Sequence, residues 1–412
     1  MGYVDLQRVQ AVLTQQHLDG LLVVSPENFE YFAGVSGFPV TMWRRGGPAS
    51  ALVNADGALA FVIPDVNAAA VQRANPQATV WSYPLWIEEV NIADYADLNI
   101  TEAVARAVAG RNHVRPETYD QRDLDGALRA ALAQLNLVGK RIGVELEFAP
   151  SAHFAHMQRT LPIAEFVNSS PLIRELRLIK TPREIDILRR GVQLTEHGIL
   201  AALEGVTTTT LAQDICAQFS MACTTRARQQ RELGFQGART TVHLGPWLWS
   251  QTDPYRPAQR GDMLQFDSSV QLSGYKTDIG RTFVLDAATS SQQRIQDALL
   301  AGFAAGRAEL RPGRRFCDVF LAVAEAVRAA GFPSYARGHF GHSIGSDIDG
   351  EEWPWISAHE TRILAPGMVL AFEVPYYVNG IGGFQNEDQL LITEDGHESL
   401  NTLPLELATV SI

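Results

Sequence analysis

Five side chains that can bind metal ions lie in the C-terminal half of the chain, each inside an apolar stretch typical of a buried β-strand. They are Asp267 in MLQFDSSV, Asp278 in GYKTDIGRTF, His342 in GHFGHSIG, Glu373 in VLAFEVPYY and Glu387 in FQNEDQLLI. A buried carboxylate without a counter-charge is costly, and it takes up a proton instead of staying ionised. The pattern therefore predicts a fold that gathers these strands around a pair of divalent cations. Oxygen ligands with one imidazole suit Mn or Fe first, with Co or Zn as alternatives.

The composition is that of a folded protein with a large core. Of the 412 residues, 46% are hydrophobic and 19% are charged, which excludes global disorder and suggests two or three domains. The net charge is −12 and no basic run is present, so nucleic acid is not an expected partner. No apolar run approaches the ~18 residues that cross a membrane, and the first residues contain no apolar signal segment. We therefore expect a cytoplasmic protein with no membrane partner.

The first part of the chain alternates between strand and helix patterns. A hairpin is predicted over 49–63, with its turn at Asn54-Ala55-Asp56-Gly57. Such alternation is typical of an α/β module with a partly parallel sheet, and we place this domain at residues 1–168. Its other predicted elements are helices over 5–18, 65–74, 101–110 and 151–160 and strands over 21–24 and 141–147.

The second part, residues 169–412, passes from helices to strands and back. Thr181-Pro182-Arg183-Glu184 is a helix-start signature, with Thr at the N-cap, Pro at the first helical position and Glu at the third. Strand-like runs begin at 239 and return at the C-terminal end. We therefore expect an α+β domain in which helices flank a curved antiparallel sheet. The predicted helices run from the signature to about 203 and over 209–224, 291–309 and 317–330.

The ligand pattern resembles that of the "pita-bread" peptidase family M24, which includes Xaa-Pro peptidases, methionine aminopeptidase and creatinase. The similar segments are FD-x10-DIGRTF, GHSIG, PGMVLAFEVP and NEDQLLIT, and the N-terminal module resembles the creatinase-type N-terminal domain. The resemblance implies two divalent metal ions, with Asp278 and Glu387 bridging both. Asp267 would complete the ligands of one ion, and His342 and Glu373 those of the other.

The resemblance also implies a function. It predicts a metal-dependent hydrolase that cleaves a C–N amide bond in a short peptide or small amide, as Xaa-Pro peptidases do, through a hydroxide bridging the two metals. Glu373 would shuttle the proton from this nucleophile to the leaving nitrogen. Family members commonly form homodimers in which an N-terminal loop reaches the neighbouring site. Arg44 and Arg45 in TMWRRGGP are therefore predicted to bind a substrate carboxylate, with a solvated basic loop as the alternative.

The chain departs from the Xaa-Pro peptidases at three positions around the metal ligands. These peptidases carry histidines there, whereas this chain has Ser250, Gly338 and Asp349. His243 and His339 lie nearby in the sequence and are predicted to act in catalysis in their place. Asp349 is predicted to contact the substrate.

Two Trp-rich segments, GPWLWSQ and EEWPWI, lie close to these positions. Trp249 and Trp353 are predicted to bind a cationic substrate, because aromatic faces attract cations, although packing on loops is the alternative interpretation. This feature favours an alternative function, a non-peptidase M24 enzyme for a small zwitterionic metabolite. It would act by ectoine- or creatine-type hydrolysis or as a dimethylsulfoniopropionate-type lyase. A non-catalytic binding protein of the same fold would typically lack the metal ligands that this chain keeps.

Overall fold

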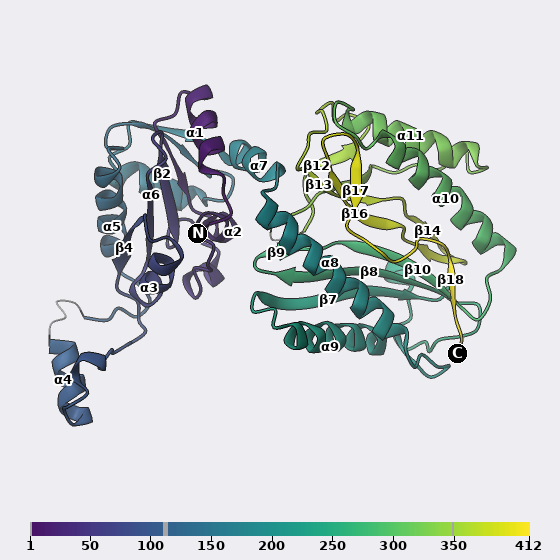
Figure 1. Ribbon diagram of the computed structural model, residues 1–412, viewed down its shortest axis with the longest axis horizontal. Helices are drawn as coiled ribbons and strands as arrows, with labels where there is room; N and C mark the ends of the chain where they lie inside the picture. Colours follow the sequence, from purple (N-terminus) through teal and green to yellow (C-terminus); the bar gives the residue numbers. More distant parts are fainter. Residues whose placement is uncertain (1, 110–113, 348–349) are drawn as a thin grey trace. The chain divides into compact units, whose positions relative to one another are not determined.

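The computed structural model describes residues 2–109, 114–347 and 350–412. The chain divides into two compact units, residues 1–176 and 177–412 (Figure 1). The predicted boundary between 168 and 169 lies before this division, at the end of strand β6 (Glu165–Asn168) and ahead of helix α7 (Ser170–Leu178). Within the described residues, no helix combines the length and hydrophobicity that crossing a bilayer requires.

The N-terminal unit is built on a mixed six-stranded sheet of order β4-β3-β2-β1-β5-β6. Strands β1, β5 and β6 run parallel to one another, as do β3 and β4, whereas β2 is antiparallel to both of its neighbours. The predicted α/β fold class is confirmed. The strands are β1 (Gly20–Val23), β2 (Ser50–Asn54), β3 (Leu59–Pro64), β4 (Thr79–Tyr83), β5 (Arg141–Val144) and β6.

The predicted hairpin over 49–63 is confirmed as β2 and β3. The Asn54 side-chain Oδ1 accepts hydrogen bonds from the backbone N–H groups of Asp56 and Ala58, and Gly57 adopts a positive φ of 81°. An Asn side chain that bonds its own turn, followed by a glycine with positive φ, is a typical tight connection between antiparallel strands.

Helices cover this sheet and supply the N-terminal core. Apolar side chains of α5, among them Leu128 and Leu132, pack against Leu22, Leu52 and Ile142 from three adjacent strands. The helices are α1 (Leu6–Gln15), α2 (Pro26–Ala33), α3 (Asp65–Ala74), α4 (Ile100–Ala109), α5 (Gln121–Gln134), α6 (Ser151–Thr160) and the short 3-10 helices η1 (Val40–Trp43) and η2 (Ala93–Tyr95).

The C-terminal unit contains a ten-stranded, largely antiparallel sheet with a main path of β12-β11-β13-β16-β10-β8-β7. Strands β9, β17 and β18 pair with β8, β16 and β10 respectively, and β14 and β15 form a separate ribbon. The strands are β7 (Phe235–Leu244), β8 (Met263–Leu272), β9 (Tyr275–Lys276), β10 (Ile279–Leu285), β11 (His339–Ser343), β12 (Glu352–Ser357), β13 (Val369–Glu373), β14 (Tyr376–Val378), β15 (Gly382–Phe384), β16 (Glu387–Ile392), β17 (His397–Ser399) and β18 (Ala408–Val410).

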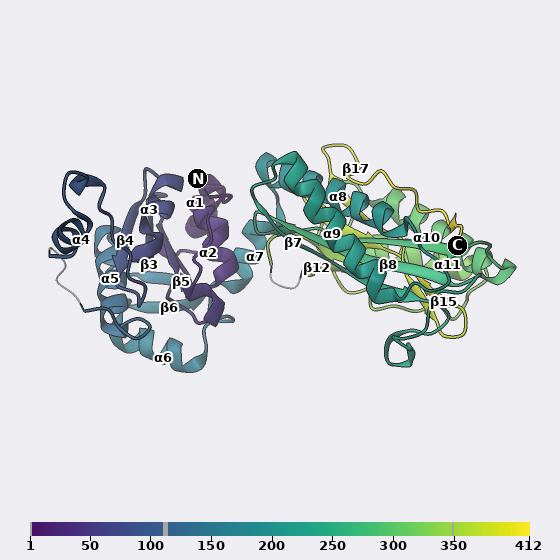
Figure 2. The same cartoon turned by 90° about the horizontal axis from the view of Figure 1, so that it is seen from below.

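Two pairs of helices flank this sheet, as predicted. Helices α8 and α9 pack on β8 and β7, and α11, paired with α10, packs on β11 and β12 (Figures 1 and 2). The predicted capping box at Thr181 and Glu184 is present at the start of α8. The helices are α8 (Pro182–Leu203), α9 (Ala212–Gln230), α10 (Ser290–Glu309), α11 (Phe316–Ala329) and the 3-10 helix η3 (Trp249–Gln251).

The core under α10 determines which face of the central strands remains available for chemistry. Phe372 of β13 packs against Phe303 with ring centroids 4.7 Å apart. Gly306 permits this approach, because a Cβ at that position would lie 2.4 Å from the Phe372 ring. Successive side chains of a strand point to opposite faces, so Glu373 points away from this core.

Candidate metal centre

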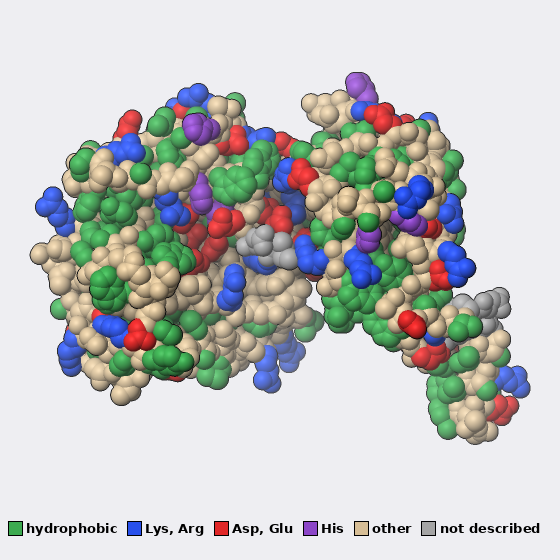
Figure 3. Space-filling view, turned by 180° about the vertical axis from the view of Figure 1, so that it is seen from behind, with side chains coloured by type: hydrophobic (Ala, Val, Ile, Leu, Met, Phe, Trp, Pro, Cys, Tyr) green, Lys and Arg blue, Asp and Glu red, His purple; other side chains and the backbone are tan. Residues whose placement is uncertain are grey.

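The five predicted metal ligands line one pocket of about 240 Å³ in the C-terminal unit. Figure 3 shows Asp and Glu side chains gathered beside histidine on the face of this unit. The pocket residues are Trp249, Asp267, Asp278, Arg337, His339, His342, Glu351, Glu373, Tyr377, Gln385 and Glu387.

Strand register brings the acidic residues together from distant parts of the sequence. Glu373 of β13 lies directly opposite Glu387 of β16, and Glu387 lies opposite Gly280 of β10. Gly280 in turn lies opposite Asp267 of β8, and Asp278 immediately precedes β10. Directly opposed residues point to the same face of a sheet, so strands β13, β16 and β8 present their acids on the same face.

His342 approaches this space from β11. Its Nε2 lies 3.7 Å from Asp278 Oδ2, and ligand atoms of Asp278, His342 and Glu387 all lie within 4.8 Å of one another. Its Nδ1 lies 2.9 Å from the Ser343 carbonyl oxygen. A ring nitrogen that donates to a carbonyl leaves the other nitrogen free to bind metal, which is common among metal-binding histidines.

The environment of the acids at the centre of the pocket disfavours their charged forms. Burial raises the pKa of Asp267, and it raises the pKa of Asp278 and of Glu387 well above their ordinary values. Neighbouring carboxylates add to each shift, Glu387 acting on Asp278 and Glu373 acting on both Asp267 and Glu387. Cations would stabilise the charged forms of all three groups. The donor set of carboxylate oxygens and one imidazole therefore fits divalent metal ions.

Glu373 differs from these acids because donors hold both of its oxygens. Arg337 Nη2 donates to Oε1 at 2.5 Å, and Gln385 Nε2 donates to Oε2 at 2.9 Å. The Gln385 Oε1 accepts a hydrogen bond from the Tyr377 hydroxyl at 3.0 Å. None of these three residues was predicted from the sequence. Gln385, two residues before Glu387, and Arg337, two before His339, could have been noted from their positions beside the motifs.

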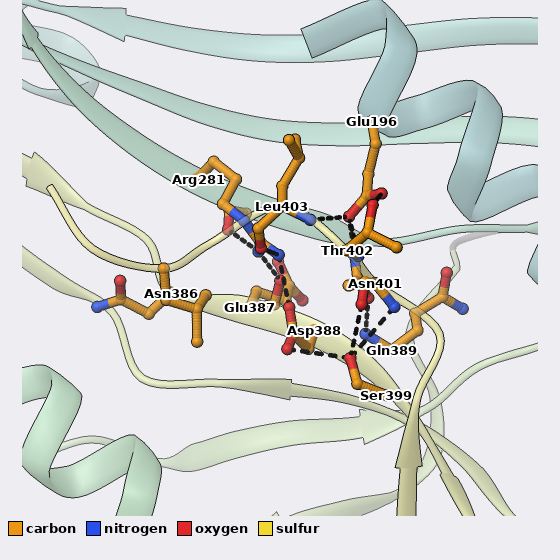
Figure 4. Close-up of polar contacts among 12 residues, drawn as sticks. Glu196, Arg281, Asn386, Glu387, Asp388, Gln389, Ser399, Asn401, Thr402 and Leu403 are labelled. Atoms are coloured by element: carbon orange, nitrogen blue, oxygen red, sulfur yellow. Dashed lines mark hydrogen bonds and ion pairs between the residues drawn. The ribbon is translucent and has the colours of Figure 1, made fainter. Parts of the chain in front are cut away.

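A second polar network lies behind β16 and fixes the backbone that carries Glu387 (Figure 4). Arg281 of the DIGRTF segment is buried and donates to the Glu387 carbonyl at 2.5 Å and to Asp388 Oδ1 at 2.6 Å. Glu196 of α8 accepts hydrogen bonds from the backbone N–H groups of Thr402 and Leu403. The Arg281 bonds tie the start of β16 to β10, and the Glu196 bonds tie the segment after β17 to α8.

The two histidines predicted to act in catalysis occupy different environments. His339 lines the pocket, with Nδ1 3.5 Å from Glu373 Oε1, and burial lowers its pKa. His243 is not among the pocket residues. It lies edge-on to Trp249, with ring centroids 4.8 Å apart, and its buried Nε2 has no hydrogen-bond partner among the described residues. Burial also lowers the pKa of His243.

Of the aromatic and acidic residues predicted to contact the substrate, only some line the pocket. Trp249 lines the pocket and lies edge-on to Tyr377, with ring centroids 5.5 Å apart. Trp353 is not among the pocket residues, and its ring packs against the Arg362 guanidinium, 4.2 Å from the ring centroid. Asp349 lies outside the described residues.

The two arginines of the predicted substrate clamp belong to the N-terminal unit. Arg44 pairs with Glu27 at 2.5 Å and lies over the Phe148 ring, and Arg45 lies over the Trp43 ring. Arg44 and Arg45 directly follow η1. The backbone turns sharply there, because Arg44 has a positive φ of 48°. Their proposed reach into a neighbouring site stays a prediction.

Comparison with known proteins agrees with this architecture. The model of metallopeptidase family M24 matches residues 186–394, and that of the creatinase/prolidase N-terminal domain matches residues 6–179. The chain belongs to metallopeptidase family M24. This M24 protein is therefore an enzyme of the metallohydrolase type, and the predicted pita-bread fold with a creatinase-type N-terminal domain is confirmed.

Individual relatives have low sequence identity to this chain, but the aligned regions are long. The chain is 26% identical over 245 residues to the Xaa-Pro dipeptidase of Pyrococcus furiosus, covering 60% of this chain and 69% of that protein. It is 26% identical over 298 residues to the creatinase of Bacillus sp. strain B-0618, covering 68% and 70%. The structure of an Xaa-Pro dipeptidase from Bacillus anthracis superposes with a TM-score of 0.77 at 18% identity, covering 98% of each chain. This last likeness concerns the fold alone.

Proposed function

We propose that this M24 protein hydrolyses the C–N amide bond of a short peptide, with a substrate preference close to that of Xaa-Pro dipeptidases. The observation that supports the proposal is the convergence of Asp267, Asp278, His342, Glu373 and Glu387 on one pocket. The similarity to the Pyrococcus furiosus enzyme directs the proposal to dipeptides.

In this proposal, the residues that would hold two divalent ions are Asp267, Asp278, His342, Glu373 and Glu387. The chemistry that such ions would supply when bound is Lewis-acid activation of water and of the scissile carbonyl group. Mn or Fe suits the donor set best, with Co or Zn as alternatives.

The protein's own groups would perform the remaining steps. Glu373 would take the proton of the nucleophile and pass it to the leaving nitrogen, while Arg337 and Gln385 hold its carboxylate in place. His339, kept neutral by burial, can exchange hydrogen bonds with the substrate. Trp249 and Tyr377 would form an apolar wall that excludes water from one side of the substrate.

A homodimer, with Arg44 and Arg45 reaching the neighbouring site, extends this proposal. An arginine at that position would bind a substrate carboxylate through two parallel hydrogen bonds. The cytoplasmic location expected from the sequence stays a prediction.

A second candidate function is hydrolysis or β-elimination of a small zwitterionic metabolite. The Trp249–Tyr377 wall favours it, because aromatic rings attract ammonium or sulfonium groups. Ser250 and Gly338, which stand where Xaa-Pro peptidases of the family carry histidines, favour it as well.

The deciding experiment is turnover of an Xaa-Pro dipeptide panel by protein reconstituted with Mn, Fe, Co or Zn. Asp278→Ala serves as the blank, and Asp297→Ala, at an exposed position on α10, serves as a matched control. We expect dipeptide hydrolysis that Asp278→Ala abolishes and Asp297→Ala retains. A fully metallated protein that cleaves no dipeptide but converts a betaine-type or sulfonium zwitterion would establish the second candidate instead.

A further inference from the structure

The amide of Gln385 joins two of the proposed metal ligands. Its Nε2 donates to Glu373 Oε2 at 2.9 Å and to Glu387 Oε2 at 3.2 Å. These two glutamates lie directly opposite each other on β13 and β16, where like charges repel. A single amide nitrogen with two N–H donors therefore holds both carboxylates side by side.

Every part of Gln385 is itself held in place. Its backbone N–H donates to the Thr282 hydroxyl oxygen at 2.7 Å, and its carbonyl accepts from the same hydroxyl group at 3.2 Å. The side-chain stem occupies space left by Gly280, where a Cβ would lie 1.9 Å from Gln385 Cγ. The glycine of the DIGRTF segment thus makes room for the glutamine.

Tyr377 determines which way the amide faces. Its hydroxyl donates to Gln385 Oε1 at 3.0 Å, which leaves the Nε2 donors directed at the carboxylates. The reverse orientation would place the amide oxygen against two acidic groups and leave the tyrosine hydroxyl facing N–H donors. The Tyr377 ring also lines the pocket, so this bond connects the pocket wall to the ligand pair.

The glutamine orients the two acids without neutralising them. Arg337 already donates a charged hydrogen bond to Glu373, but Gln385 adds only neutral donors between Glu373 and Glu387. The negative charge on the Glu387 side therefore remains available to a cation. Groups that hold metal ligands in this way typically alter metal affinity by about 10- to 100-fold.

We infer that Gln385 is a positioning residue of the metal centre, aligning Glu373 and Glu387 for cation binding, with Tyr377 setting the orientation of its amide. This inference rests on the proposed function, because it assumes that both glutamates bind metal.

The test compares Gln385→Leu and Tyr377→Phe with the matched control Gln265→Leu. Gln265 is also 2% exposed and also lies two residues before a proposed ligand, Asp267. Its Oε1, however, has no hydrogen-bond partner among the described residues. The full-length variants are titrated with Co²⁺ by calorimetry, and the visible absorption spectrum of bound Co²⁺ is recorded. Thermal unfolding of the metal-free proteins checks that each variant is folded.

We expect Gln385→Leu to weaken binding of at least one Co²⁺ ion by about 10- to 100-fold and to change the cobalt spectrum. Tyr377→Phe should act in the same direction by a smaller factor, and Gln265→Leu should match the wild type. Wild-type affinity and spectrum in a folded Gln385→Leu would overturn the inference. If that variant does not fold, unchanged binding and spectrum in Tyr377→Phe would overturn it. A wild-type protein that binds no ion would instead refute the proposed function itself.

Discussion

The two units of this M24 protein each bury a glutamate, but they surround it in opposite ways. In the N-terminal unit, Glu145 is 3% exposed and accepts four hydrogen bonds. The donors are Val24 N, Ser25 N, Ser25 Oγ and Asn28 Nδ2. In the C-terminal unit, the equally buried Glu387 carboxylate accepts one hydrogen bond from the described residues, that of Gln385.

We interpret Glu145 as a structural acid and propose that Glu387 is a functional one. The donors to Glu145 lie at the end of β1 and the start of α2, so its carboxylate joins a strand to a helix N-terminus and is satisfied by the protein alone. Burial raises the pKa of Glu387 instead, and the charges of Glu373 and Asp267 add to that shift. The number of donors around a buried acid, more than its burial, therefore indicates whether a cation is needed.

Removal of the Glu387 carboxylate should have the largest effect. Glu387→Ala should reduce hydrolysis to the background of the Asp278→Ala blank and release at least one metal ion per chain, because a proposed metal ligand is lost. Elemental analysis after dialysis and steady-state kinetics measure both effects. Full metal content with normal turnover would show that Glu387 is as structural as Glu145.

Removal of the Glu145 carboxylate should lower the stability of the fold but leave the metal content unchanged. Glu145→Leu leaves the Val24 and Ser25 N–H groups without an acceptor, so we expect about 3 kcal/mol of lost stability from hydrogen bonds to a charged group. Urea unfolding followed by circular dichroism measures the loss. The folded variant should keep its metal content, and a loss of metal at unchanged stability would reverse the assignment.

The pH dependence of stability sharpens the contrast further. The folded-state pKa values of Asp267, Asp278 and Glu387 are raised, so the metal-free folded protein retains protons that the unfolded chain releases. Their contribution to stability is therefore complete below the unfolded pKa values of about 4 and is lost as the pH rises through the folded ones.

Thermal unfolding in a chelator, between about pH 5 and 8, tests this trend. Asp278→Asn should reduce the decline with pH, and saturating metal should abolish it. A decline of equal size in wild type and Asp278→Asn would show that other groups cause it.

Substitution of Trp249 and of Trp353, both predicted from the sequence to bind substrate, should affect KM differently. Trp249→Ala removes a pocket wall and should raise KM by about tenfold, close to 1.4 kcal/mol. Trp353→Ala should leave KM unchanged, because that ring stacks on Arg362. Equal KM values in the two variants would remove Trp249 from the proposed substrate contacts.

The smallest expected effect concerns the N-terminal loop. Arg44→Ala should weaken substrate binding several-fold without loss of metal, and Arg45→Ala provides its neighbouring comparison. Kinetics at several substrate concentrations measure both. If neither substitution changes KM or kcat, the proposed clamp across a dimer is wrong.

Local sequence signals predicted many of the elements well. Helices α3 and α6 have the predicted bounds, and the capping box at Thr181 begins α8 where expected. Helices α2 and α5 were missed, although Ser25 and Asp120 cap them and could have revealed them. In both helices polar residues interrupt the apolar pattern, so the hydrophobic periodicity by which helices are recognised in a sequence is weak there.

The fold class and the five candidate metal ligands could be predicted from the amino-acid sequence alone. Each of these acids and the histidine lies in a short motif with a characteristic neighbourhood, and strand alternation points each side chain to a face without reference to distant residues. Contacts with Arg337, Tyr377 and Gln385 were decided only by the tertiary structure. They depend on strand register and on the space at Gly280, and the sequence around each residue does not encode which distant group will face it.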